Sequence, residues 1–382
     1  MIFYEYRNTS VQGSSGGDEK TGAISFPIYQ TATFKHLGLN KSTGYDYSRD
    51  TNPTREEVEK TVAKLEKGIG AIGFSSGVSA IVCCIHLFKS GDHIILSEDL
   101  YGGTFRLFNE TFSDFGITYS FVDTTNTSNI KNALNENTKA IFIETPSNPT
   151  MRVTDIKAVG KISKDNNILL IVDNTFLTPY YQKPLTLGAD LVIHSGTKYL
   201  GGHHDLLAGF IVGNDKNLLD KLKRTHMSIG ATLSPFDSWL LLRGIKTLHI
   251  RLDRAQENAL KLAEFLKSNS NVSKVLYVGL KDFNGYDANL KQATGFGSTL
   301  SFRIKDKSLV PKILENVKII KFAESLGGVE TLITYPFTQT HADIPEDIRQ
   351  RLGIDEYLLR LSVGIELSLI HISEPTRLRC IS

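Results

Sequence analysis

Five short apolar runs in this sequence each lead into residues that could do chemistry. The run ADLVI is followed by HSGTK, in which Lys198 stands among small hydroxyl residues and glycines. The other four runs lead into a carboxylate, an amide, a tyrosine and a Ser-Ser-Gly junction, which are Asp173, Asn148, Tyr101 and residues 75–77. Crevice ligands of open α/β sheets bind beyond the carboxyl ends of the strands. If the runs are parallel strands, these five groups face one crevice.

Each of these groups also has an ordinary structural interpretation. An isolated lysine such as Lys198 is usually a surface residue. Asp173 could cap a helix, and Tyr101 could be a packed aromatic ring. Serine and glycine are good N-caps, so SSGVSA could be a plain helix start. Only the combination of groups changes the interpretation.

Together, these groups are the ones that pyridoxal 5′-phosphate (PLP) requires. A lysine forms a Schiff base with its aldehyde, and a carboxylate keeps the pyridine nitrogen protonated so that the ring acts as an electron sink. Hydroxyls and the free N–H groups of a helix N-terminus hold a phosphate, and an aromatic ring stacks on the pyridine. The combination predicts a PLP enzyme. The alternative is a non-catalytic α/β ligand-binding module in which Lys198 acts only electrostatically.

Three further residues fit this chemistry less directly. Tyr47 and Arg49 are two apart in YDYSRDTNPT, so in an extended segment they point the same way. An arginine with a phenol is a good phosphate clamp, although a polar surface loop explains the spacing equally well. Arg360 lies in the apolar run YLLRLSVG, where a charge usually has a partner. That partner is either a substrate carboxylate or an internal Asp or Glu.

The elements that position these residues follow from the hydrophobic pattern. From about residue 56, short apolar runs typical of buried parallel strands alternate with helical stretches. REEVEKTVAKLEKG predicts a helix with Gly68 as its C′ residue, and VSAIVCCIHLFKSG predicts one closed by Gly91. The pattern predicts an α/β fold with a large, mostly parallel sheet.

The chain is expected to have four parts: an N-terminal arm (1–50), a large cofactor-binding domain (51–240), a smaller α+β C-terminal domain (241–366) and an atypical tail (367–382). The start is rich in Gly, Ser and Thr and shows little periodicity, which predicts an extended arm. The stretch SPFDSWLLLRGIKTLHIRLDRAQENALKLAEFLKSN predicts one or two long helices. The tail lacks a helical apolar face and resembles a cloning or sequencing scar. We expect it to be poorly ordered.

Composition excludes several classes of partner. The 382 residues are 41% hydrophobic and 22% charged with a net charge of +2, as in an ordinary globular protein without a nucleic-acid partner. Three cysteines form neither a disulfide framework nor a metal site of usual spacing. No signal peptide is visible, and no segment approaches the roughly 20 apolar residues that span a bilayer. A cytoplasmic protein without membrane contact is expected.

The motifs in combination resemble the Cys/Met metabolism family of PLP-dependent enzymes, which have the fold-type-I, aspartate-aminotransferase-like fold. The resemblance runs from about residue 20 to residue 366. The segments that carry it are YSRDTNPT, SSGVSAI, DLYGGTFRLF, ETPSNP, IVDNTF, IHSGTKYLGGH, ESLGGVETL, THADIP and LLRLSVGIE.

The resemblance implies a role for each matching residue. Lys198 would be the Schiff-base lysine and proton carrier, Asp173 would pair with the pyridine nitrogen, and Asn148 would bond the phenolic oxygen. Tyr101 would stack on the ring and help deprotonate the substrate amine. The remaining roles are phosphate binding by Gly77, Val78, Ser195 and Thr197, phosphate binding in the neighbouring subunit by Tyr47 and Arg49, and substrate-carboxylate binding by Ser325 and Arg360.

The same resemblance implies a homo-oligomer, a dimer of dimers with active sites shared across the dimer. Glu324 matches an acidic position of cystathionine γ-synthases and γ-lyases, where β-lyases tend to have an aromatic residue. Gly103 stands where methionine γ-lyase-like members often have cysteine. We therefore expect γ-replacement in methionine biosynthesis, from O-acyl-L-homoserine and L-cysteine, or sulfide, with cystathionine γ-lyase activity as the alternative. His204 has no role that the sequence suggests.

Overall fold

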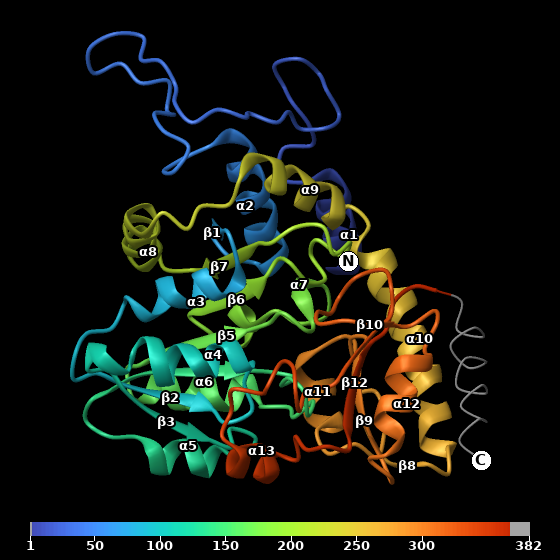
Figure 1. Cartoon of the computed structure of the whole chain (residues 1–382). Helices are drawn as coiled ribbons and strands as arrows, with labels where there is room; N and C mark the ends of the chain where they lie inside the picture. The colour runs from blue at the N-terminus through green and yellow to red at the C-terminus, as the bar shows by residue number, and fades with distance from the viewer. Residues whose placement is uncertain (1, 367–382) are drawn as a thin grey trace.

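The computed structural model describes residues 2–366, so the expectations about the 367–382 tail lie outside the described residues. Two sheets stand side by side and are joined by long helices (Figure 1). No helix within residues 2–366 combines the length and the apolar character needed to cross a membrane.

The larger sheet has seven strands in the order β1-β7-β6-β5-β4-β2-β3. All pair in parallel except β7, which is antiparallel to both of its neighbours. This confirms the predicted α/β class with a mostly parallel sheet, although the pattern did not single out β3 or β7. The strands are β1 (Gly70–Phe74), β2 (His93–Ser97), β3 (Thr118–Val122), β4 (Thr138–Glu144), β5 (Leu169–Asp173), β6 (Leu191–Ser195) and β7 (Gly209–Gly213).

Helices cover both faces of this sheet, which explains why its strands read as continuous apolar runs. In β2, Ile95 packs in one core with α2 and α6, while Ile94 and Leu96 pack in a second core with α3 and α8. The helices before residue 230 are α1 (Ile2–Gln12), α2 (Pro53–Glu66), α3 (Gly77–Ile85), α4 (Gly102–Arg106), α5 (Thr127–Ala133), α6 (Ile156–Asp165), α7 (Thr178–Tyr181) and α8 (Lys216–Ile229), with short π or 3₁₀ turns at Leu107–Thr111, Ser113–Phe115 and Pro184–Leu187.

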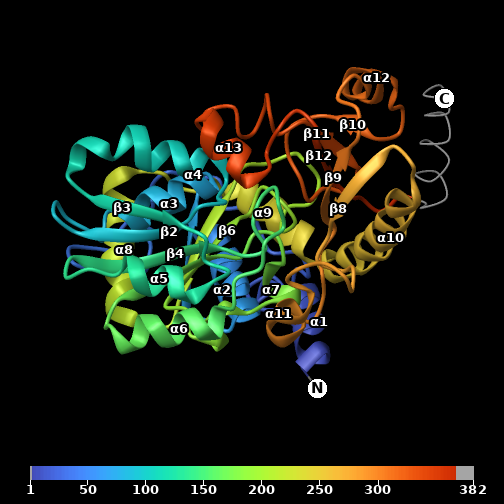
Figure 2. The same ribbon diagram turned by 90° about the horizontal axis from the view of Figure 1, so that it is seen from below.

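The smaller sheet has five strands in the order β10-β11-β12-β9-β8, with α10 and α12 packed on its outer side (Figure 2). The predicted smaller α+β region is therefore present, while its boundary at residue 240 stays a prediction. Its elements are α9 (Pro235–Ile245), α10 (Leu248–Ser268), β8 (Val272–Leu276), α11 (Tyr286–Gln292), β9 (Thr299–Ile304), α12 (Leu309–Asn316), β10 (Lys321–Phe322), β11 (Leu332–Thr334), α13 (Glu346–Leu352) and β12 (Leu358–Ser362).

The expectation of an extended arm from the first residue was wrong for the start of the chain, where α1 forms. Tyr6 and Ser10 of α1 are buried, and the Ser10 hydroxyl donates to the carbonyl oxygen of Ile245 at 2.8 Å. Packing against the body thus overrides the weak local pattern. Residues 13–52 contain no helix or strand and run across the top of the body in Figure 1.

Two predicted helix ends were also wrong. Helix α2 ends one residue earlier than expected, because Lys67 rather than Gly68 adopts the left-handed conformation, with φ of 64°. Gly68 has a different reason to be glycine, since a Cβ there would lie 2.5 Å from Cγ1 of Val212 on β7. Helix α3 ends at Ile85, and the chain then makes tight turns before Gly91, which has φ of 89°.

Candidate active site

Lys198 follows the end of β6 in a tight turn. Its N–H donates to the carbonyl oxygen of Ser195 at 3.2 Å, and its carbonyl oxygen accepts from the N–H of Gly202 at 2.8 Å. The Lys198 Nζ atom donates to Oγ of Ser325 at 3.1 Å. Burial, together with the charge of Arg360, lowers the pKa of the Lys198 amine to about 8. An amine with such a pKa is available near neutral pH to accept a proton.

Arg360 is a buried cation on β12, with 1% of its surface exposed. It donates to Asn148 Oδ1 at 2.8 Å, to the carbonyl oxygen of Ser325 at 2.9 Å and to Thr334 Oγ1 at 3.2 Å. Its Nε atom is buried without a hydrogen-bond partner, and no ion pair joins it to a carboxylate within residues 2–366. Burial lowers its pKa to about 10. Arg360 is therefore not explained by an internal Asp or Glu, and it could receive a ligand carboxylate.

Asn148 is held from both ends. Its Oδ1 atom faces the Arg360 guanidinium, which leaves the amide NH₂ as a donor for a further acceptor. Its backbone carbonyl oxygen accepts from Nε2 of His341 at 3.0 Å. Burial lowers the pKa of His341 to about 3, so this imidazole is neutral and donates one N–H. The sequence analysis did not anticipate His341 or Thr334.

Asp173 and Glu144 are neighbours at the ends of β5 and β4, directly paired in the sheet register. Oδ1 of Asp173 accepts from the N–H and the hydroxyl of Thr175, at 3.0 and 2.6 Å. Burial raises the pKa of Asp173, and burial together with the Asp173 charge raises that of Glu144. Asp173 could meet a protonated ring nitrogen. Glu144 was missed, although it ends the apolar run KAIFIE as a lone carboxylate.

The N-terminus of α3 could hold an anion beside the end of β6. Ser76 caps this helix by accepting from the N–H of Ser79 at 3.1 Å, so the N–H groups of Gly77 and Val78 have no intrahelical acceptor. The two elements touch here, because a Cβ at Gly77 would lie 2.9 Å from Cβ of Ser195.

The hydroxyl groups of Ser195 and Thr197, at and just after the end of β6, differ in their surroundings. The hydroxyl of Thr197 exchanges hydrogen bonds with the backbone of Ala208 at 2.9 and 3.3 Å. Ser195 instead uses its backbone N–H, which donates to Thr175 Oγ1 at 2.8 Å. Its hydroxyl is the more available of the two for an anion.

The ring of Tyr101 lies over Gly103, and the residue is 39% exposed. A Cβ at Gly103 would lie 2.4 Å from Cε1 of Tyr101, so any side chain there displaces the ring. A Cβ at Gly102 would lie 2.2 Å from the carbonyl oxygen of Thr340. Gly103 of the YGGT motif thus leaves room for the Tyr101 ring, and Gly102 leaves room for the Thr340 carbonyl.

Two predicted site residues, Tyr47 and Arg49, lie apart from this group, and a third, Glu324, lies at its edge next to Ser325. Tyr47 is 47% exposed, and the Arg49 guanidinium is 5.4 Å from its ring centroid. Arg49 donates to the carbonyl oxygen of Met227 at 3.1 Å, and none of its described bonds reaches Lys198. Glu324 is exposed, although its charge acts on Arg360.

His204 has a packing role that the sequence did not suggest. It has φ of 56°, and its Nε2 atom lies 3.8 Å from Oε2 of Glu330. A Cβ at Gly328 would lie 1.9 Å from that Nε2 atom, and one at Gly327 would lie 2.6 Å from the backbone nitrogen of Tyr199. The loop after Lys198 therefore rests directly on the loop after Ser325.

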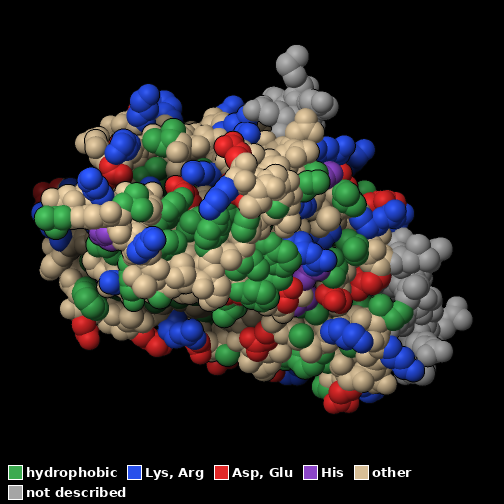
Figure 3. Space-filling view, turned by 90° about the horizontal axis from the view of Figure 1, so that it is seen from above, with side chains coloured by type: hydrophobic (Ala, Val, Ile, Leu, Met, Phe, Trp, Pro, Cys, Tyr) green, Lys and Arg blue, Asp and Glu red, His purple; other side chains and the backbone are tan. Residues whose placement is uncertain are grey.

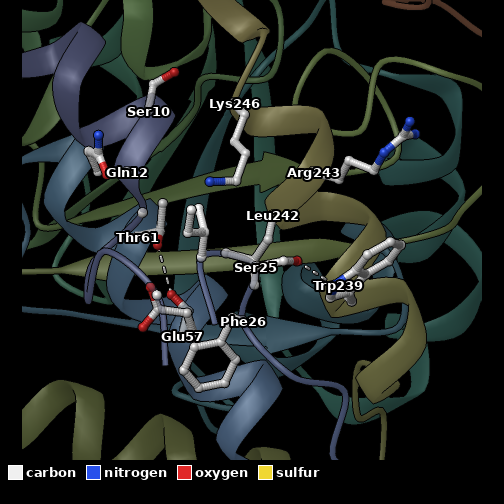
Figure 4. Close-up of a pocket in the computed structure, with 13 residues that line it drawn as sticks. Ser10, Gln12, Ser25, Phe26, Glu57, Thr61, Trp239, Leu242, Arg243 and Lys246 are labelled. Atoms are coloured by element: carbon white, nitrogen blue, oxygen red, sulfur yellow. Dashed lines mark hydrogen bonds between the residues drawn. The ribbon is translucent and has the colours of Figure 1, made fainter. Parts of the chain in front are cut away.

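A cavity of about 320 Å³ lies elsewhere, between the N-terminal segment, α2 and α9 (Figure 4). On its wall, Glu57 accepts from the N–H groups of Ser14 and Ser15, and Trp239 donates to Ser25 Oγ at 3.3 Å. None of the predicted site residues lines it.

Comparison with known proteins agrees with the predicted family. The chain matches the model of the Cys/Met metabolism PLP-dependent enzymes over residues 8–368. It is 50% identical over 349 residues to the cystathionine gamma-synthase/O-acetylhomoserine (thiol)-lyase of Bacillus subtilis (strain 168), covering 91% of this chain and 89% of that one. It is 49% identical over 356 residues to the cystathionine beta-lyase of Lactococcus lactis subsp. cremoris (strain MG1363), covering 93% and 94%.

A solved structure confirms the fold type. The cystathionine gamma-lyase from Lactobacillus plantarum complexed with L-serine superposes with a TM-score of 0.94 at 41% identity, covering 97% of each chain. The chain thus has the PLP fold-type-I architecture. With the family match over nearly its whole length, it belongs to the Cys/Met metabolism family of PLP-dependent enzymes and is a trans-sulfuration enzyme of the synthase or carbon–sulfur lyase type.

Proposed function

We propose that this enzyme catalyses γ-replacement: O-acyl-L-homoserine and L-cysteine, or sulfide, give L-cystathionine, or homocysteine, and a carboxylate. The observation that carries the proposal is the hydrogen-bonded path from the buried Arg360 guanidinium through Ser325 to the Lys198 amine. It offers a carboxylate site beside a base, which suits an α-amino acid. The amino-acid chemistry of the trans-sulfuration family supports the same substrate class.

The cofactor would be held by residues that surround Lys198. Asp173 would face its ring nitrogen, the Asn148 amide its phenolic oxygen and the Tyr101 ring its π-face. Its phosphate would meet the N–H groups of Gly77 and Val78 and the hydroxyls of Ser195 and Thr197. When bound, PLP supplies the electron sink that stabilises negative charge at the substrate Cα.

The side chains of the chain do the binding and the proton transfer. Arg360 and Ser325 would bind the substrate carboxylate and so fix Cα above the Lys198 amine. Tyr101 would accept a proton from the substrate ammonium group. The Lys198 amine, with its pKa lowered to about 8, would take the Cα proton, hand it on to the bound cofactor, and so be free to take a Cβ proton. The acyl group then leaves as a carboxylate, the thiolate adds at Cγ, and the protons return.

The choice of γ- over β-chemistry rests on Glu324. This exposed carboxylate directly precedes Ser325, and its charge acts on Arg360. An acidic group at the mouth of the site could attract the ammonium group of an incoming cysteine. Cystathionine γ-lyase activity is the second candidate, because the same residue pattern and the similar Lactobacillus plantarum structure fit it as well.

One assay separates the reactions. The purified enzyme is incubated with O-acetylhomoserine, O-succinylhomoserine or cystathionine, each with and without cysteine or sulfide. Cystathionine or homocysteine formed from an acylhomoserine supports the proposal. Release of 2-oxobutanoate and cysteine from cystathionine as the faster reaction assigns the lyase instead, and pyruvate with homocysteine assigns a β-lyase and refutes both γ-reactions.

We also propose that the site is completed by a second copy of the chain. The segment 13–52 carries exposed apolar side chains, including Ile24 at 85%, Leu37 at 68% and Leu39 at 92%. Seen from above, hydrophobic side chains gather in the middle of this face among lysines and arginines (Figure 3). Exposed apolar surface of this kind marks interaction sites. Tyr47 and Arg49 on this segment would then reach the phosphate of the neighbouring subunit.

A further inference from the structure

A buried carboxylate beside the site has a geometry that the proposed reaction does not use. Only 7% of Glu144 is exposed. Its Oε2 atom accepts a hydrogen bond of 3.0 Å from the backbone N–H of Tyr101. The backbone N–H of Asn148 also faces this carboxylate, closely enough to lower its pKa against the effect of burial. One side chain at the end of β4 thus meets two separate loops, those that follow β2 and β4.

We propose that Glu144 is a positioning residue, a clamp that fixes the backbone of Tyr101 and Asn148 relative to the end of the large sheet. The roles of these two residues in catalysis rest on the proposed function. The clamp itself is a property of the chain without ligand, so it can be tested separately.

The loop at Tyr101 depends on this anchor because it has little rigidity of its own. Helix α4 has five residues, and Tyr101 precedes it without a side-chain cap hydrogen bond. The Tyr101 residue is partly exposed, and its ring lies over Gly103. The Tyr101 N–H donates to Glu144, which ties this loop to the end of β4. Glu144 therefore contributes to the position of the ring, together with the bonds of Asp99 in the same loop.

The loop at Asn148 passes the effect on to the substrate site. The Asn148 amide accepts from Arg360, whose guanidinium also binds the backbone of Ser325. A second buried carboxylate, Asp99, accepts from the hydroxyls of Ser147 and Thr150 in the same loop. Asp99 lies two residues before Tyr101, so these bonds also tie the two loops to each other, and Glu144 adds a second tie from the end of β4.

The charges around the clamp come from several elements. Asp173 lies in register on β5, Asp99 lies after β2, and Arg360 on β12 feels the Glu144 charge. Glutamine at position 144 keeps one oxygen acceptor of the same reach for the Tyr101 N–H and cannot carry a charge next to Asp173, so it should preserve much of the clamp. Alanine should remove it.

The test measures amide hydrogen exchange by mass spectrometry in the cofactor-free protein, with peptides covering residues 100–106 and 146–152. The variants are Glu144→Ala, Glu144→Gln and the shortened Glu144→Asp. Glu57→Ala is the matched control, because Glu57 is also buried and accepts from two backbone N–H groups, at 2.8 and 3.0 Å, in the cavity of Figure 4.

We expect Glu144→Ala to speed exchange in both peptides by about tenfold or more, with Glu144→Gln close to the parent protein. In the loaded enzyme, kcat should fall about tenfold or more with a smaller change in KM, since the Tyr101 ring is misplaced. Glu57→Ala should speed exchange only around residues 14–15. If Glu144→Ala does not fold, Glu144→Asp should loosen the same two peptides.

Unchanged exchange in both peptides overturns the clamp, and so does equal loosening by Glu57→Ala, which would reflect a general loss of stability. If the peptides loosen but the parent enzyme performs none of the γ-reactions, the clamp stands and only the proposed function fails.

Discussion

The strand-end cluster around Lys198 and the N-terminal segment 13–52 contrast sharply in how they are held. Lys198, Asn148 and Arg360 are tied to one another within the chain by buried or half-buried hydrogen bonds. Tyr47 and Arg49 are exposed and contact mainly each other and the end of α8. The chain thus preorganises the half of the site that would do the chemistry. The half proposed to grip the phosphate of a neighbour is exposed in the single chain and has few internal contacts.

The largest effect that would separate the two regions is expected at Arg360. Arg360→Leu should lower kcat/KM by about 10³-fold, because it removes a buried, charge-assisted contact to the substrate carboxylate. The kcat/KM of Arg360→Lys should lie between those of the parent enzyme and Arg360→Leu, since lysine keeps the charge but not the planar guanidinium group. Steady-state kinetics with O-acylhomoserine measure both, and cofactor absorbance is the control. If the cofactor-loaded Arg360→Leu variant has a kcat/KM within about threefold of that of the parent enzyme, Arg360 does not bind the substrate carboxylate.

The arm is expected to give a smaller loss that a second chain can repair. Arg49→Ala should lower activity by about tenfold to a hundredfold, through weaker phosphate binding. The Arg49→Ala variant is then dissociated, mixed with an equal amount of the inactive Lys198→Ala variant and reassociated. About half of the dimers should be hybrids, and each hybrid has one intact site of two, so up to about a quarter of the parent's active sites should be restored. If native mass spectrometry confirms that hybrid dimers have formed but activity does not recover, Arg49 acts in the active site of its own chain.

A cysteine at position 103 should disturb the cluster more mildly. Because a Cβ there would lie 2.4 Å from the Tyr101 ring, Gly103→Cys should shift the ring and lower kcat by about threefold to thirtyfold. Gly103→Ala is the matched variant and should have a similar effect, since the clash comes from the Cβ atom. An effect confined to cysteine would point to the thiol rather than to the ring position.

The smallest effect is on stability and depends on pH. The folded-state pKa of Lys198, about 8, lies below the ordinary value of 10.5, so its charged form is disfavoured by folding. Lys198→Met should therefore stabilise the cofactor-free protein below pH 8 by up to about 3 kcal/mol. This advantage should shrink as the pH rises from about 8 to 10.5, because stability of the parent rises there. Urea unfolding across this range measures it, and a pH-independent difference would contradict the burial of the charge.

The strand-end cluster could be anticipated because it depends on local signals. Lys198, Asp173 and Asn148 each follow an apolar run, and a parallel sheet brings such positions to one edge. Glu144, Thr334 and His341 were missed, since their importance depends on contacts with loops and strands far away in the sequence. The helix α1 was missed for a related reason: the packing of Tyr6 against Tyr180 of α7 and of Ser10 against the end of α9 is a tertiary effect that local periodicity does not show.

The most direct test of the account concerns Lys198. The PLP-loaded enzyme is reduced with borohydride, digested and mapped by mass spectrometry. We predict that the visible absorbance is bleached and that the cofactor mass is found on Lys198, with none on Lys183 or Lys246. Attachment at another lysine, or absence of covalent cofactor in saturated protein, would contradict the assignment of Lys198 as the residue around which the site is built.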